Sequence, residues 1–167
     1  MEIKQEVQEK QVEAEFSKLR DELQNHKNGI LDQLTSLLTD LIQENLERAK
    51  KVDWDRAGEQ GASQSCFKEI VSNMELMHQG IAPVLPQQNL KVIFGEALTC
   101  LGKGLDDVFT PLNVNSAHAK KKLKAQLKYL VKKLSQQKFE NEELTDMIVK
   151  KLTALLNAQG TTNNEES

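Results

Sequence analysis

The chain has few of the residues that cross-link a fold or bind a metal ion. Its 167 residues include two cysteines, three prolines and 4% aromatic residues. Cys66 and Cys100 are too few and too far apart for a disulfide framework or a zinc motif, and His26, His78 and His118 are scattered along the chain. We therefore expect no metal, no cofactor and a reducing compartment.

Long apolar runs and an excess of positive charge are also missing. No run approaches the roughly 20 residues that a membrane-spanning helix needs, and the charged residues Met1–Glu6 do not resemble a secretory signal. We expect any work at a membrane to be that of a peripheral component. The net charge of -3 argues against a generally basic nucleic-acid-binding domain, although it allows a local basic patch.

The sequence motifs of common catalytic sites are absent. The chain has no His-Glu-x-x-His, no Gly-x-Ser-x-Gly and no Cys-x-x-Cys. Gly102-Lys103-Gly104 lacks both the upstream glycine and the following Ser or Thr of a phosphate-binding loop. The sequence therefore predicts a protein that is not an enzyme, and leaves open polar groups that converge only in three dimensions.

Helical periodicity is the dominant pattern that is present. Hydrophobic residues make up 38% of the chain and recur every three or four positions in several segments. No strand-like alternation and no internal repeat stands out. This pattern predicts an all-α fold, an elongated antiparallel helical bundle of four to five helices with a long first helix.

The first predicted helix runs from Val12 to about Lys50, and we interpret Gly29 as a soft spot in it. Its apolar face, with His26 filling one gap, comprises Val12, Phe16, Leu19, Leu23, Ile30, Leu34, Leu37 and Leu41. We expect residues 1–15 to be a charged extension of this helix. Residues 16–158 are then a single helical-bundle domain, and residues 159–167 a disordered polar tail.

Capping and breaking residues place the later helices. Ser65 is expected to cap a second helix that ends near Leu85, and Pro86 to begin a third. Ser116 is a possible cap for a fourth, and helical spacing continues or restarts from Phe139. The glycines at 102 and 104 predict a kink or the close approach of a neighbouring helix.

Apolar residues on these faces form the predicted core. We expect it to contain Leu37, Leu41, Phe67, Ile70, Met74, Met77, Ile81, Ile93, Leu101, Leu127 and Leu144. We expect both cysteines to be small buried hydrophobic residues, with Cys66 a weaker candidate for redox chemistry at a helix N-terminus. His26 and His78 are interpreted as core or boundary residues in preference to ligands.

The fourth predicted helix is locally very basic. Its lysines, with no acidic residue between them, are Lys120, Lys121, Lys122, Lys124, Lys128, Lys132, Lys133 and Lys138. Opposite an apolar face, Lys121, Lys124, Lys128 and Lys132 are a candidate surface for anionic lipid or an acidic partner. Alternatively they are a solvated face balanced by residues 1–50, which carry eleven acidic and seven basic residues. Nucleic acid is not expected, because Tyr129 is the only interleaved aromatic residue.

One stretch resembles a known family. The residues Ser65-Cys66-Phe67-Lys68-Glu69-Ile70, then Met74, Met77-His78 and Leu85-Pro86-Gln87-Gln88, are similar to the C-terminal domains of vacuolar protein sorting-associated protein fifty-four. That family belongs to the Golgi-associated retrograde protein (GARP) complex. The likeness covers roughly residues 20 to 155 and is sharpest from Ser65 to Gln88.

The resemblance implies a helical-bundle fold of the multisubunit-tethering-complex (CATCHR) type. It implies a non-catalytic module that acts in retrograde transport from endosomes to the trans-Golgi network, on the cytoplasmic face of those membranes. Implied partners are other GARP subunits, through the parent chain, and membrane proteins such as SNAREs or small GTPases. A peripheral bundle that binds anionic lipid through the Lys-rich helix remains the alternative.

Overall fold

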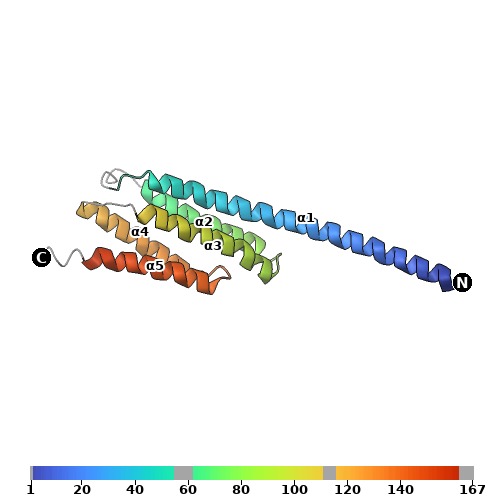
Figure 1. Cartoon of the computed structure of the whole chain (residues 1–167). Coiled ribbons are helices and arrows are strands. Elements are labelled where there is room, and N and C mark those ends of the chain that lie inside the picture. The colour runs from blue at the N-terminus through green and yellow to red at the C-terminus, as the bar shows by residue number, and fades with distance from the viewer. Residues whose placement is uncertain (1, 55–61, 111–115, 162–167) are drawn as a thin grey trace. The chain divides into compact units, whose positions relative to one another are not determined.

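The fold is all-helical. The computed structural model describes residues 2–54, 62–110 and 116–161, in which every regular element is a helix (Figure 1). The helices are α1 (Glu2–Lys50), α2 (Ala62–Ile81), α3 (Gln87–Phe109), α4 (Ala117–Gln136) and α5 (Glu142–Thr161). Two compact units divide the chain, Met1–Leu34 and Thr35–Ser167. The larger unit therefore begins at Thr35, whereas the sequence placed the start of the bundle at residue 16.

The first unit is the N-terminal part of α1. The helix starts at Glu2, ahead of the predicted Val12, and continues through Gly29, whose backbone keeps a negative φ. From residue 2 to residue 30 every described side chain is exposed. Gln24 Nε2 donates a hydrogen bond of 3.1 Å to Asn28 Oδ1, one turn further along.

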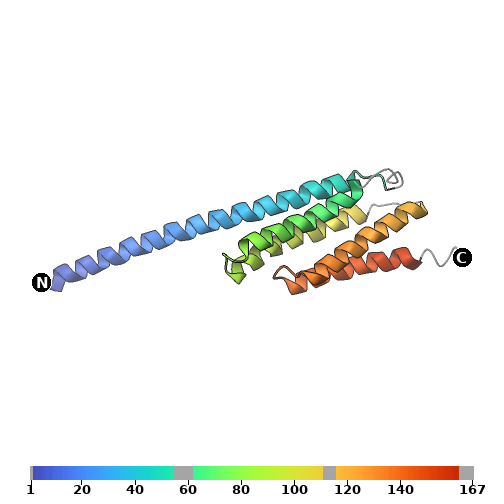
Figure 2. The same cartoon turned by 180° about the vertical axis from the view of Figure 1, so that it is seen from behind.

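The second unit is a bundle of α2 to α5 and residues 35–50 of α1. In α2 and α3, and again in α4 and α5, consecutive helices run in opposite directions (Figures 1 and 2). Its largest fully buried side chains are Phe67, Phe94, Leu38, Ile42, Ile70, Met74, Ile93, Leu98, Leu101, Leu127, Leu130 and Leu134. Four of the expected core residues, Leu41, Met77, Ile81 and Leu144, are only half-buried.

The buried face of α1 differs from the predicted one. Leu37, an expected core residue, is 52% exposed, whereas its neighbour Leu38 is fully buried. The buried residues of α1 are Thr35, Leu38, Ile42, Asn45, Leu46 and Ala49. One residue turns a helix by about 100°, so this face lies to one side of the predicted Leu37 face. The assignment of Leu37 to the core is wrong.

The start of α2 also differs from the prediction, while that of α4 follows it. Helix α2 begins at Ala62, so Ser65 lies within its first turn and is not the residue before the helix. Ser116 is the N-cap of α4, where its Oγ accepts a 3.1 Å hydrogen bond from the backbone N–H of Ala119. Capping of this kind satisfies a donor that the helix itself leaves unpaired.

Helix α5 is a restart and not a continuation of α4. Phe139 and Glu140, between the two helices, have positive φ values of 48° and 60°. Asn141 fixes this turn, since its Nδ2 donates to the carbonyl oxygens of Phe139 (2.9 Å) and Lys91 (3.0 Å). Helix α5 runs through Gly160 to Thr161, and the rest of the expected tail, residues 162–167, lies outside the described residues.

Candidate functional site

The basic stripe of α4 consists of Lys121, Lys124, Lys128 and Lys132. These residues follow one another at intervals of three or four, which places them on one face of the helix. The opposite face is buried through Ala119, Leu123, Gln126, Leu127, Leu130 and Leu134. Ser116 fixes where the helix begins, and packing of the leucines fixes its rotation. The stripe is therefore held by the bundle in one orientation.

Other basic residues of α4 and α5 are used within the bundle. Lys133 Nζ lies 3.8 Å from Glu75 Oε1 of α2, and Lys151 Nζ lies 2.9 Å from Asp106 Oδ2 of α3. Among the residues that the structure describes, no carboxylate forms an ion pair with the four lysines of the basic stripe. Their charge is thus available to an anionic ligand.

Among the described residues, the ion pairs of the bundle part of α1 lie within that helix and with α2, and none reaches the four lysines. Of the carboxylates on residues 35–50, Glu47 accepts a 2.8 Å hydrogen bond from Lys50 of its own helix, which lowers the Glu47 pKa. Arg48 Nη1 donates a 3.1 Å hydrogen bond to Glu69 Oε2 of α2, and this bond raises the Arg48 pKa. Both pairs are exposed, so each contributes little to stability.

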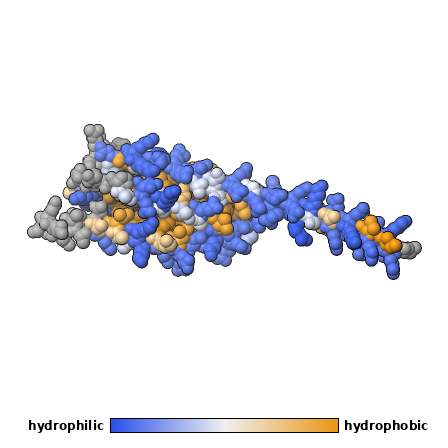
Figure 3. All heavy atoms as spheres, viewed as in Figure 1, coloured by the Kyte–Doolittle hydropathy of each residue, from blue (hydrophilic) through white to orange (hydrophobic). Residues whose placement is uncertain are grey.

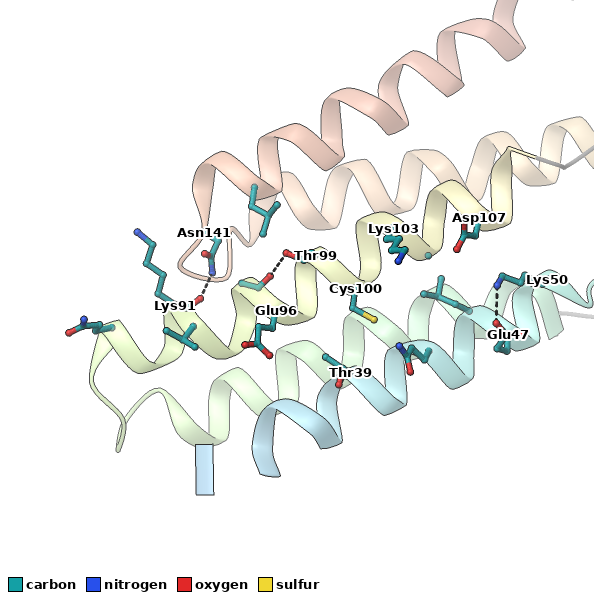
Figure 4. Close-up of a pocket in the computed structure, with 17 residues that line it drawn as sticks. Thr39, Glu47, Lys50, Lys91, Glu96, Thr99, Cys100, Lys103, Asp107 and Asn141 are labelled. Carbon is teal, nitrogen blue, oxygen red and sulfur yellow. Dashed lines mark hydrogen bonds and ion pairs between the residues drawn. The ribbon is translucent and has the colours of Figure 1, made fainter. Parts of the chain in front are cut away.

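An open groove of about 1180 Å³ lies between residues 35–50 of α1 and helix α3 (Figure 4). Its charged lining residues are Glu47, Lys50, Lys91, Glu96, Lys103 and Asp107. Apolar and small residues, among them Leu46, Val92 and Gly104, complete the lining. Thr99 Oγ1 donates a 2.8 Å hydrogen bond to the carbonyl oxygen of Gly95 in its own helix, so this hydroxyl already has a partner. The lining therefore mixes both signs of charge.

Cys100, at the edge of this groove, is half-buried. Burial raises the pKa of its thiol, and Asp40 adds to the rise, while a hydrogen bond with Gln43 and the charge of Lys103 oppose it. A raised pKa leaves less thiolate at neutral pH, and the thiolate is the nucleophilic form. Cys66, the other cysteine, is buried at 2% exposure in α2. The environment of Cys100 therefore does not favour nucleophilic chemistry.

His78 joins three parts of the bundle. Its ring meets Phe94 of α3 edge-on at 5.3 Å and Phe139 at 6.0 Å, and those two phenyl rings stack on each other at 5.4 Å. His78 Nε2 lies 3.4 Å from Glu140 Oε1. Gln87 Nε2 donates a 2.9 Å hydrogen bond to Glu140 Oε2. His78 therefore lies at the boundary of the core, where it links the α2–α3 connection to the α4–α5 connection.

The remaining expectations concern metals and membranes. In the described part of the chain, no cluster of three or more His, Cys, Asp or Glu side chains has the geometry to hold a metal ion. Within residues 2–54, 62–110 and 116–161, none of the helices combines the length and the apolar character that crossing a bilayer requires.

Sequence reasoning missed the face that α1 buries and the role of Phe139. The doublets Leu37-Leu38 and Leu41-Ile42 fit either face, and only Leu46 and Ala49, further along the helix, favour the buried one. For Phe139, no sequence signal indicated a left-handed turn, since neither it nor Glu140 is a glycine or an asparagine.

Comparison with known proteins identifies no relative: no protein-family model, no curated protein and no solved structure matches the chain.

Proposed function

We propose that this chain is a non-catalytic helical module of a vesicle-tethering complex subunit, of the CATCHR type. It acts in retrograde transport from endosomes to the trans-Golgi network, on the cytoplasmic face of those membranes. Its partners are other GARP subunits, through the parent chain, and membrane proteins such as SNAREs or small GTPases. The single observation that carries the proposal is the resemblance of Ser65–Gln88 to the C-terminal domains of that family.

The structure of that segment is compatible with the proposal. Residues 65–88 cover most of α2, the connection after it and the first residues of α3. Phe67, Ile70 and Met74 are fully buried, and the Phe67 ring stacks on Phe109 at 5.7 Å. These residues support the bundle, so the surface that meets a partner has to come from residues outside this buried set.

Retrieval of cargo from endosomes tests the tethering proposal. The native gene product is depleted from its own cells, and a cargo receptor that cycles between endosomes and the trans-Golgi network is followed by microscopy. The proposal predicts that the receptor accumulates in peripheral vesicles and returns when the wild-type gene is restored. Unchanged receptor distribution after complete depletion would contradict the proposal.

The basic stripe of α4 favours a second candidate function, binding to an anionic lipid surface. Its four lysines share one face and lack carboxylate partners among the described residues. Each lysine near an anionic bilayer contributes about 1 kcal/mol, so four together give measurable affinity. The attraction is electrostatic and therefore weakens as salt is added.

Vesicle sedimentation separates this candidate from simple solvation of the lysines. Vesicles of phosphatidylcholine with phosphatidylserine are compared with pure phosphatidylcholine at low salt. Reversal of Lys121, Lys124, Lys128 and Lys132 to Glu should abolish binding to the anionic vesicles. A control variant reverses the exposed Lys4, Lys10, Lys18 and Lys51, with the same change in net charge. Equal binding by wild type and the stripe variant would exclude the stripe as a lipid-binding surface.

A further inference from the structure

An exposed apolar face runs along the N-terminal part of α1. We call it the seam: Val12, Phe16, Leu19, Leu23, His26 and Ile30. The five apolar members are between 44% and 69% exposed, and His26 is exposed as well. The space-filling view shows apolar side chains on the otherwise hydrophilic surface of this segment (Figure 3). An apolar face of this length in water is typical of a helix that pairs with another helix.

The spacing of the seam is that of a coiled coil. Successive members are four, three, four, three and four residues apart, which is the alternation of heptad positions d and a. Phe16, Leu23 and Ile30 take position a, and the other three take position d. In the same register the residues that α1 buries in the bundle, including Leu38 and Ile42, fall at positions b, c and f. The seam and the buried residues of α1 therefore occupy different heptad positions.

The charges beside the seam decide which occupant fits. Glu15 and Glu22 take position g, and Arg20 and Lys27 take position e of the following heptads. In a parallel pair, each g residue faces the e residue five positions later in the other helix. Two copies in register therefore place Glu15 opposite Arg20, and Glu22 opposite Lys27, on both sides of the pair. The preceding g and e positions hold Gln8 and Glu13, which neither attract nor repel strongly.

Other arrangements fit less well. An antiparallel pair brings position g against position g, so that Glu15 and Glu22 of the two copies repel each other. A bilayer surface favours an excess of basic residues beside the apolar face. Residues 12–30 carry four acidic and three basic residues instead. We propose that the seam pairs with the seam of a second copy of this chain, as a parallel two-stranded coiled coil.

Sedimentation equilibrium of the full chain over a range of concentrations tests this proposal. Because the seam covers fewer than three heptads, the dimer is expected to dissociate on dilution. Glu15→Lys with Glu22→Lys, or Arg20→Glu with Lys27→Glu, turns four attractive pairs into repulsive ones. Each double variant should raise the dissociation constant of the dimer at least about tenfold.

Mixing the two double variants tests whether the g and e positions face each other across the pair. In the mixed pair the g residues at positions 15 and 22 again face opposite charges, so heterodimers should form with about the wild-type affinity. Asp21→Lys with Asp32→Lys is the matched control for Glu15→Lys with Glu22→Lys, since it makes the same net charge change at positions f and c. This control should leave the dissociation constant within about threefold of wild type. Circular dichroism establishes that each variant keeps its helical content.

Three results would overturn the proposal. One is a wild-type chain that stays monomeric up to about 1 mM. Another is a dimer that Glu15→Lys with Glu22→Lys does not weaken, which would indicate antiparallel pairing or another interface. The third is equal weakening by the control variant, which would reflect net charge alone. A wild-type monomer whose seam variants lose binding to vesicles or to another protein would assign the seam to that partner instead.

Discussion

Gly104 of α3 lies directly against the side chain of Leu46 of α1, so closely that a Cβ at position 104 would overlap Leu46 Cδ1. Leu46 is buried at 3% exposure, and both residues also line the groove between α1 and α3. On the other side of α3, a Cβ at Gly102 would lie 3.3 Å from Ile148 of α5. Of the two expectations for these glycines, the close approach of neighbouring helices is the one observed.

Gly104→Ala is therefore expected to gain less stability than its change in helix propensity predicts. A Cβ there requires the end of the Leu46 side chain to move, and overpacking of a core contact costs about 1–3 kcal/mol, against roughly 1 kcal/mol gained in propensity. The free energy of unfolding, measured in urea, should lie below that of Gly80→Ala. Gly80→Ala is the control, because nothing lies within 4 Å of a Cβ there and its φ is negative. That variant should gain about 0.4–1 kcal/mol, and a loss of equal size in both variants would contradict this account.

A comparison of two adjacent leucines tests the orientation of α1 in the bundle. Leu38→Ala should cost about 2–5 kcal/mol, because Leu38 is fully buried. Leu37→Ala should cost under about 1 kcal/mol, because Leu37 is 52% exposed. Both values come from urea unfolding of the full chain. The reverse order would show that the helix buries the face predicted from the sequence.

The turn between α4 and α5 depends on Asn141. Asn141→Ala removes the donors to the carbonyls of Phe139 and Lys91. These two bonds together contribute about 1–3 kcal/mol, because each is worth about 0.5–1.5 kcal/mol. The control is Gln136→Ala at the exposed end of α4, which should change stability by under about 0.5 kcal/mol. An unchanged midpoint for Asn141→Ala would mean that the turn is held by the packing of Phe139 alone.

The thiol of Cys100 should react slowly. Its pKa is raised, chiefly by burial, so the folded chain holds less thiolate at pH 8 than an exposed peptide thiol does. Alkylation by iodoacetamide, followed by mass spectrometry of peptides, should be slower than for the same residue in the unfolded chain. The rate should rise as pH increases beyond the ordinary value of a thiol. A rate at pH 7 above that of the unfolded chain would instead indicate an activated thiol.

Much of the fold follows from the sequence through local rules. The three-and-four spacing of apolar residues predicts the helices, and Ser116 predicts the start of α4. The face that α1 buries does not follow, because Leu37 and Leu38 are equally apolar and only packing within the bundle selects between them. Likewise, only part of the candidate site follows from the sequence. The sequence predicts a row of lysines, whereas the pairing of Lys133 with Glu75 depends on how α2 and α4 meet.

The proposed tethering function requires that this chain assemble with the subunits of a tethering complex, and affinity capture measures that assembly. The native gene product is captured from its own cells, and quantitative mass spectrometry identifies its companions. We expect the other GARP subunits to be recovered in amounts comparable to the captured chain. Their absence, with lipid or unrelated proteins recovered instead, would contradict the tethering function and leave the basic stripe of α4 as the basis of a membrane-binding role.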